Sequence, residues 1–467
     1  MKKIPCCYRL FKQYSTEGFQ IKTGNRIGPW TYLQPGPQTI AYTQSLLYNI
    51  VMKKAFFTLS LFLSALLAVP ASAARNQANA KPHSAADSSV VGSVLPNFQM
   101  DENWLDFVQS PVFEVSGPID EGQPLTRGAY PQDLKQYSFW YLNDINKKVI
   151  SGASKTVDVA MYSINIADNV NDLIEAANRG VKIRLLMDEK HCYPSLHKEV
   201  KRLLEVPGVQ FKTIRGYGDW GVNHNKIVIS DREIVTAGSY NWTFSATYQN
   251  LENSVVLKDP RYVNGYVSYF DWMWERGRAL QATQPGPIAP GTYGIPPQAP
   301  VIATFNGVEV PAFIFSPGSR SEERLAALID AAKVSVDACT FSFSSNILAD
   351  ALIRAHKRGV KVRFMMDQKI AQTSYTARYL YQSGTDFKVR AGRKGKGALH
   401  NKFIIIDGKV MQTGSFNWAQ NASVNSFENM VFFVDAYHIK GYQNTYDTLY
   451  AETVTVGPDH FNALDQQ

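Results

Sequence analysis

Two stretches of the chain carry the same polar residues at the same spacing. In each, a histidine is followed by a lysine after 2 positions, an aspartate after 7, an asparagine after 17 and a glutamate after 28, with a serine two residues before the asparagine. The first copy consists of His224, Lys226, Asp231, Ser239, Asn241 and Glu252, and the second of His400, Lys402, Asp407, Ser415, Asn417 and Glu428. Packing alone rarely duplicates a polar pattern at fixed offsets, so the pattern indicates a functional site.

These residue types suit the cleavage of a phosphodiester, an anion that must be neutralised and positioned before a nucleophile can approach. The lysines supply positive charge, the asparagines amide donors and the serines hydroxyl groups. Two imidazoles on opposite sides of phosphorus allow one to attack while the other protonates the leaving oxygen. The glutamates suit an orienting role, in which each accepts the proton of a rear imidazole nitrogen. Burying two lysines costs several kcal/mol unless an anion or acidic side chains lie between them, so an anion site is favoured over a purely structural one.

The elements that must hold these residues can be read from the flanking sequence. The apolar runs 227–229 and 403–406 are β-branched or aromatic, which predicts that each motif lies on a buried strand. Residues two apart on a strand share a face, so each histidine and its lysine are expected to point the same way. Asp231 and Asp407 have the opposite parity and lie in sequences typical of turns, which favours a supporting role for them.

Helical and strand patterns alternate through both halves of the chain. In the first half we expect helices near 139–152, 167–178 and 196–204, and strands at 157–163, 181–187 and near 209. Strand 334–343 and the segment 358–367 repeat this order with a constant offset of 179 residues. The pattern predicts an α/β fold with a mixed, mainly parallel sheet in each half, flanked by helices.

The paired His-x-Lys-x4-Asp and Gly-Ser-x-Asn-Trp motifs resemble those of the phospholipase D superfamily, the HKD phosphodiesterases. The Glu-Asn pairs at 252–253 and 428–429 are most similar to the branch that contains small bacterial nucleases and the mitochondrial cardiolipin hydrolase. The resemblance implies two tandem phospholipase D-like α/β domains with pseudo-twofold symmetry and one shared site. It also implies His224 as the nucleophile that forms a phosphohistidine, His400 as the general acid and base, and no metal or other cofactor.

The domain boundaries follow from composition. Residues 98–278 and 301–456 are predicted to be the two phospholipase D-like domains, joined by the Pro- and Gly-rich linker 279–300. A flexible spacer is expected at 74–97 and a tail at 457–467.

An export signal is predicted at residues 52–73. It has Lys53 and Lys54, an apolar run at 55–69 and the small residues Ala71-Ser72-Ala73. The apolar run is shorter than the roughly 20 residues of a spanning helix, which favours a cleaved signal over a membrane anchor. We expect cleavage near Ala73 and a secreted or periplasmic protein, with residues 1–51 a spurious upstream extension from a misplaced start codon.

The charge distribution bears on the substrate. The chain carries a net +8, but residues 1–73 hold eight basic and one acidic residue, so the remainder carries only +1. Such a balance gives no broad footprint for nucleic acid. A basic segment, 388–396, precedes the second motif and suits either a polyanion or anionic lipid head groups. Tyr217 and Trp220 precede the first motif and suit either a membrane interface or base stacking.

Two substrates therefore remain open. The low charge and the fusion of both copies in one chain favour a phosphodiesterase of phospholipids, anionic ones in particular, acting as a monomer with transient membrane-surface contact. The alternative is a non-specific, metal-independent endonuclease that cleaves DNA or RNA. A catalytically inactive binding module is disfavoured because both copies are complete. Cys192 and Cys339 are expected to be free or buried, Trp242 and Trp418 to pack in the core, and the remaining histidines to be solvated or structural.

Overall fold

The computed structural model describes residues 129–465, and these belong to one compact unit. The predictions for residues 1–51, 52–73 and 74–97, and for the start of the first domain at 98, lie outside the described residues. Within 129–465, no helix combines the length and the apolar character that crossing a bilayer requires.

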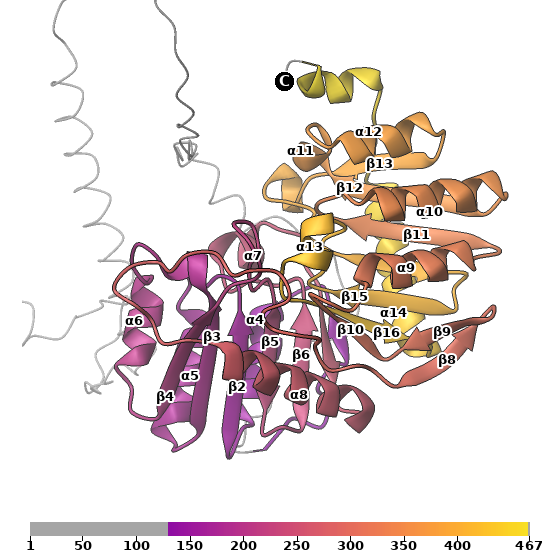
Figure 1. Ribbon diagram of the computed structural model, residues 1–467. Coiled ribbons are helices and arrows are strands. Elements are labelled where there is room, and N and C mark those ends of the chain that lie inside the picture. Colours follow the sequence, from indigo (N-terminus) through magenta and orange to yellow (C-terminus); the bar gives the residue numbers. More distant parts are fainter. Residues whose placement is uncertain (1–128, 466–467) are drawn as a thin grey trace, which may run out of the picture. The chain divides into compact units, whose positions relative to one another are not determined.

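The first sheet, drawn in indigo to magenta in Figure 1, has seven strands. In spatial order they are β1 (Tyr137–Ser138), β7 (Ser254–Leu257), β6 (Ile234–Gly238), β5 (Lys226–Ser230), β2 (Thr156–Met161), β3 (Lys182–Asp188) and β4 (Val209–Ile214).

The second sheet, drawn in orange to yellow, has eight strands in an equivalent order. They are β10 (Phe313–Ser316), β16 (Glu428–Phe433), β15 (Val410–Gly414), β14 (Phe403–Ile406), β11 (Ser335–Thr340), β12 (Lys361–Asp367), β13 (Asp386–Arg390) and β17 (Val454–Thr455). A separate hairpin pairs β8 (Val301–Phe305) with β9 (Val308–Pro311).

Both sheets are mixed, as predicted, but the prediction that they are mainly parallel is wrong. Only β2, β3 and β4 in the first sheet, and β11, β12 and β13 in the second, pair in parallel. The other neighbouring strands in the two sheets are antiparallel. Between β5 and β6, and between β14 and β15, the connecting turn is too short for any other arrangement.

Helices flank the sheets, as expected. In the first half they are α4 (Leu142–Ser151), α5 (Asp168–Asn178), α6 (Lys198–Leu204), α7 (Phe244–Tyr248) and α8 (Pro260–Arg276). In the second half they are α9 (Ser321–Asp330), α10 (Asn346–Lys357), α11 (Gln368–Ala371), α12 (Tyr375–Gln382), α13 (Gln420–Val424) and α14 (Ala436–Ala451). The predicted helices near 139–152, 167–178 and 196–204 are confirmed as α4, α5 and α6.

Alternation along the strands divides the apolar residues among three cores. Ile227 and Ile229 of β5 face a core that also receives Phe403 of β14, whereas Val228 faces the core beneath α4, α5 and α6. Ile404 of β14 faces a third core, within the second half. One face of each sheet therefore packs against the helices of its own half, and the other face contributes to the shared core.

Tyrosines of α8 and α14 tie the two halves together within the shared core. The Tyr266 hydroxyl donates to Asn429 Oδ1 at 3.1 Å, and the Asn253 amide donates to the Tyr442 hydroxyl at 3.1 Å. Each helix thus bonds to the asparagine that follows the motif glutamate of the opposite half. These reciprocal contacts give the unit its pseudo-twofold symmetry.

Candidate active site

The two histidines lie just before strands rather than within them. β5 begins at Lys226 and β14 at Phe403, so His224 and His400 occupy the extended segments that lead into these strands. The His224 N–H donates to the carbonyl of Phe427, and the His400 N–H donates to the carbonyl of Leu251, both at 2.9 Å. Each histidine backbone is therefore bonded to the residue that precedes the glutamate of the other half.

This backbone pairing brings each imidazole to a carboxylate of the opposite half. His224 Nδ1 lies 3.0 Å from Glu428 Oε2, and His400 Nδ1 lies 2.8 Å from Glu252 Oε2. All four side chains are buried. When each Nδ1 donates to its carboxylate, Nε2 is left free to act on a substrate.

The serine of each Gly-Ser-x-Asn motif holds the glutamate of its own half. Ser239 Oγ donates to Glu252 Oε2 at 2.6 Å, and Ser415 Oγ donates to Glu428 Oε2 at 2.5 Å. The preceding glycine allows this approach, because a Cβ on Gly238 would lie 2.2 Å from the carbonyl oxygen of Asn253. The serines thus orient the carboxylates, which in turn orient the imidazoles.

The two lysines are buried beside the histidines. Lys226 Nζ donates to the His224 carbonyl at 2.5 Å, and Lys402 Nζ donates to the His400 carbonyl at 2.6 Å. An ammonium group has three N–H donors, so two on each lysine remain for an anion. Burial lowers the pKa of Lys226 well below its ordinary value and that of Lys402 to about 8.

The two histidines have unequal electrostatic surroundings. Burial lowers the pKa of His224 well below its ordinary value, and the charges of Lys226, Lys402 and His400 lower it further. Burial also lowers the pKa of His400, but there the Glu252 carboxylate opposes the shift. At a given pH, the His400 imidazole is therefore protonated more readily than the His224 imidazole.

The pKa values of the two glutamates shift in opposite directions. Burial raises the pKa of Glu428 to about 8, against the opposing charge of Lys226. Burial also disfavours the charged form of Glu252, but His400, Lys402 and Ser239 together outweigh it, so the pKa of Glu252 lies below its ordinary value. The sequence contributes to this difference, since Asn250 donates a further hydrogen bond to Glu252 at 2.9 Å and the equivalent residue of the second half is Ser426.

Asn241 and Asn417 lie next to the buried Trp242 and Trp418, which pack in the core as expected. The side-chain oxygen of each asparagine is buried and makes no hydrogen bond to any residue in 129–465. Rotation of either amide by half a turn places its NH2 group there, where it can donate to a phosphate oxygen.

Asp231 and Asp407 support the fold from turns outside this cluster. Both have positive φ, 51° and 53°, after β5 and β14 respectively. The Asp231 carboxylate accepts the N–H groups of residues 154–156 at 2.7–2.9 Å. Asp407 accepts those of residues 333–335 at 2.7–3.2 Å. Each aspartate therefore fastens the turn to the start of the neighbouring strand, β2 in the first half and β11 in the second.

Sequence reasoning missed two aromatic side chains that wall the site. Tyr162 contacts the His224 ring edge-on at 4.8 Å between centroids, and Phe341 contacts the His400 ring in the same way at 4.8 Å. Each also lies beneath the lysine of its half. The offset of 179 residues relates Tyr162 to Phe341, and this repeat of an aromatic residue could have identified both positions from the sequence.

The aromatic loop before the first motif and the basic segment 388–396 are less available to a substrate than their sequences suggested. Tyr217 is buried and stacks on Tyr293, so only Trp220 of that loop is available to a membrane or a base, and it is 77% exposed. In the segment 388–396, Arg390 pairs with Glu452 and Arg393 lies over the Trp140 ring. Part of this basic charge is therefore engaged within the protein.

Cys192 and Cys339 are buried and free, as expected. Among residues 129–465, no group of three or more His, Cys, Asp or Glu side chains is placed to hold a metal ion.

Comparison with known proteins gives a match in both halves. The family described as "Cardiolipin synthase, PLD-like domain" matches residues 147–274 and 325–450. The mitochondrial cardiolipin hydrolase of Xenopus tropicalis is 32% identical over 139 residues, which are 30% of this chain and 65% of that protein. A phospholipase D of Rickettsia felis is 34% identical over 122 residues, 26% of this chain and 60% of that protein. The chain thus spans less than two thirds of the length of these curated relatives.

Among solved structures, the phosphatidylserine synthase of Haemophilus influenzae Rd KW20 aligns over both halves. The alignment covers 72% of this chain and 93% of that chain, with a TM-score of 0.54 and 13% identity. At this identity, the similarity concerns the fold alone.

Proposed function

This chain belongs to the PLD-like domain family, as its duplicated motifs predicted, and we propose that it is an exported phosphodiesterase that hydrolyses phospholipids through a phosphohistidine. The observation that carries the proposal is the reciprocal pairing of His224 with Glu428 and of His400 with Glu252 around two buried lysines. Each buried ammonium group keeps N–H donors beyond the one bonded to the histidine carbonyl, and a bound phosphodiester anion would accept from them.

The reaction proceeds in two displacements. His224 Nε2 attacks phosphorus while the bond from phosphorus to the leaving oxygen breaks, and His400 donates its proton to that oxygen. The lysines and the Asn241 and Asn417 amides stabilise the charge on the non-bridging oxygens. His400 then takes a proton from water, whose oxygen attacks phosphorus and releases His224. The products are the head-group alcohol and a lipid phosphate monoester.

The assignment of the two histidines rests on their unequal surroundings. A nucleophile must be neutral, and the pKa of His224 lies well below its ordinary value because of burial and the nearby lysine charges. A general acid must hold a proton, and Glu252 opposes the lowering of the His400 pKa. The asymmetry favours attack by His224 and proton transfer by His400.

Three observations favour a phospholipid over a nucleic acid. The chain beyond residue 73 carries a net charge of only +1, and part of its basic segment pairs internally. Both motif copies are fused in one polypeptide. Two of the relatives described above are named for cardiolipin hydrolysis and for phospholipase D activity.

The test incubates purified protein, starting at Ala74, separately with phospholipid vesicles and with plasmid DNA. We expect released head group and intact plasmid, and we expect His224→Asn and His400→Asn each to abolish the release. Cleavage of plasmid with intact lipid would instead identify a nuclease, and full activity in either variant would refute the two-histidine mechanism.

A further inference from the structure

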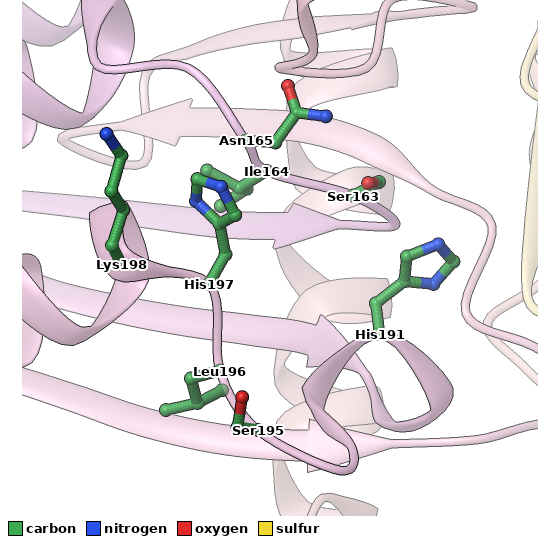
Figure 2. Close-up of a pocket in the computed structure, with 8 residues that line it drawn as sticks. All are labelled: Ser163, Ile164, Asn165, His191, Ser195, Leu196, His197 and Lys198. Atoms are coloured by element: carbon green, nitrogen blue, oxygen red, sulfur yellow. The ribbon is translucent and has the colours of Figure 1, made fainter. Parts of the chain in front are cut away.

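A pocket of about 490 Å³ opens in the first half of the chain, beside the candidate active site. Its lining residues are Ser163, Ile164, Asn165, His191, Ser195, Leu196, His197 and Lys198. Figure 2 shows His191 and Ser163 on one side of it and Lys198 on the other. The lining offers hydroxyl, amide, imidazole and ammonium donors, and none of these eight residues is acidic.

The pocket is connected to the candidate active site through Tyr162. The ring of Tyr162 contacts His224 on one side, at 4.8 Å between centroids, and His191 on the other, at 4.1 Å. Asp188, which is fully buried, lies 3.1 Å from His191 Nδ1 and also accepts the N–H of Asn223, the residue before His224. Asp188 therefore contacts His191 and also bonds to the segment that positions the nucleophile His224.

The equivalent position in the second half has different chemistry. The offset of 179 residues places Ile370 where the first half has His191. α6 begins at Lys198 after the capping residue His197, whereas α12 begins at Tyr375 after the capping residue Ser374. At these positions the first half carries imidazole and ammonium groups, whereas the second half carries uncharged side chains.

We infer that the pocket binds the polar head group of a glycerophospholipid, specifically one that carries hydroxyl groups or negative charge. The inference rests on the proposed function and narrows its substrate. A glycerophospholipid joins two unlike arms through its phosphodiester, which matches the unequal sides, whereas the two arms of a polynucleotide phosphate are alike. A quaternary ammonium group binds best among aromatic rings or beside carboxylates. The eight lining residues include no Phe, Tyr or Trp and no acidic side chain, so the pocket does not suit such a head group.

The experiment compares the binding of sn-glycerol 3-phosphate and inorganic phosphate by titration calorimetry. Phosphate probes the lysine site, while glycerol 3-phosphate also probes the pocket. In the double variant His191→Ala/Lys198→Ala, we expect the affinity for glycerol 3-phosphate to fall about tenfold more than that for phosphate, since charge-assisted hydrogen bonds are lost. Lys201→Ala, which removes an exposed lysine from the same helix, should change neither affinity.

A second measurement uses the reaction itself. The ratio of kcat/KM for phosphatidylglycerol to that for phosphatidylcholine should fall about tenfold in the double variant and stay unchanged in Lys201→Ala. Equal effects on both ligands, or on both lipids, would overturn the pocket assignment. If the wild type binds glycerol 3-phosphate no better than phosphate, the pocket assignment fails while the proposed function stands. If it binds neither, both fail.

Discussion

The reciprocal arrangement of histidines and glutamates makes a sharp prediction for Glu252→Gln. The substitution keeps the shape of the side chain but removes the negative charge that lies 2.8 Å from His400 Nδ1. Because Glu252 belongs to the first half and His400 to the second, the substitution should damage the acid and base step and leave the nucleophile in the first half intact.

The size of the effect follows from distance and burial. At 2.8 Å and an effective dielectric constant of about 20, the attraction between two unit charges is at most about 6 kcal/mol. Glu252 is fully buried, so solvent screens little of this attraction. In a Ser-His-Asp site, replacement of the orienting carboxylate by an amide lowers kcat about 10⁴-fold. We therefore expect phospholipid hydrolysis to fall by about three to four orders of magnitude.

The assay separates the two steps with bis(p-nitrophenyl) phosphate. Its leaving group departs without protonation, so formation of the phosphohistidine needs His224 and Glu428 but not His400. Glu252→Gln should release one equivalent of p-nitrophenolate rapidly and then turn over slowly, because activation of water depends on His400. Glu428→Gln should show no burst, and the exposed control Glu233→Gln should behave as wild type.

The opposite pattern would refute the reasoning. A burst that disappears in Glu252→Gln and persists in Glu428→Gln would mean either that each glutamate serves the histidine of its own half or that the histidine roles are reversed. A double-mutant cycle separates these two possibilities, because only reciprocal pairing predicts a large coupling energy between Glu252 and His400.

Four further outcomes are expected. The contribution of Lys402 to the free energy of unfolding should rise by roughly 3 kcal/mol between pH 8 and 10.5, because its pKa is held at about 8 by burial and only the unfolded chain binds that proton in this window. Calorimetry at several pH values should show this rise as the difference between wild type and Lys402→Met. Asp231→Asn weakens bonds to three backbone N–H groups and should cost about 1–2 kcal/mol in denaturant unfolding, with a far smaller loss of activity than Glu252→Gln. Gly238→Ala should prevent accumulation of folded protein, measured by circular dichroism, because its Cβ would lie 2.2 Å from the carbonyl oxygen of Asn253. EDTA should leave phosphodiester hydrolysis unchanged, and strict dependence on an added divalent metal would contradict the proposed chemistry.

Much of the fold was predictable because local pattern and tertiary structure agree. The segments 157–163 and 181–187 alternate or run apolar between helical patterns, and they form β2 and β3. The constant offset between halves then predicted β11 and β12. The mainly parallel sheet was a wrong prediction because helix-connected strands were given more weight than the short turns after β5 and β14.

The pocket beside the site was not predictable from the motifs. His191 and His197 lie in a connection whose length differs between halves, so neither matches a residue of the same type in the other copy. The sequence gives no direct sign that this connection lies against Tyr162. That contact depends on how the loop after β3 packs over the end of β2, which is a property of the tertiary structure.

The pairing of each histidine with the glutamate of the other half could have been deduced from strand order. Short turns connect β5 to β6, and β7 follows beside β6, so β7 lies two strand spacings, about 10 Å, from β5. Glu252 lies two residues before β7 and His224 two residues before β5, which separates them by too much for a hydrogen bond within one sheet. The equal spacing of 28 residues in both copies conceals this, since a symmetric pair of sequences cannot show which glutamate meets which histidine. Each half therefore supplies a motif histidine that the glutamate of the other half orients, and neither half alone contains a complete pair of motif histidine and glutamate.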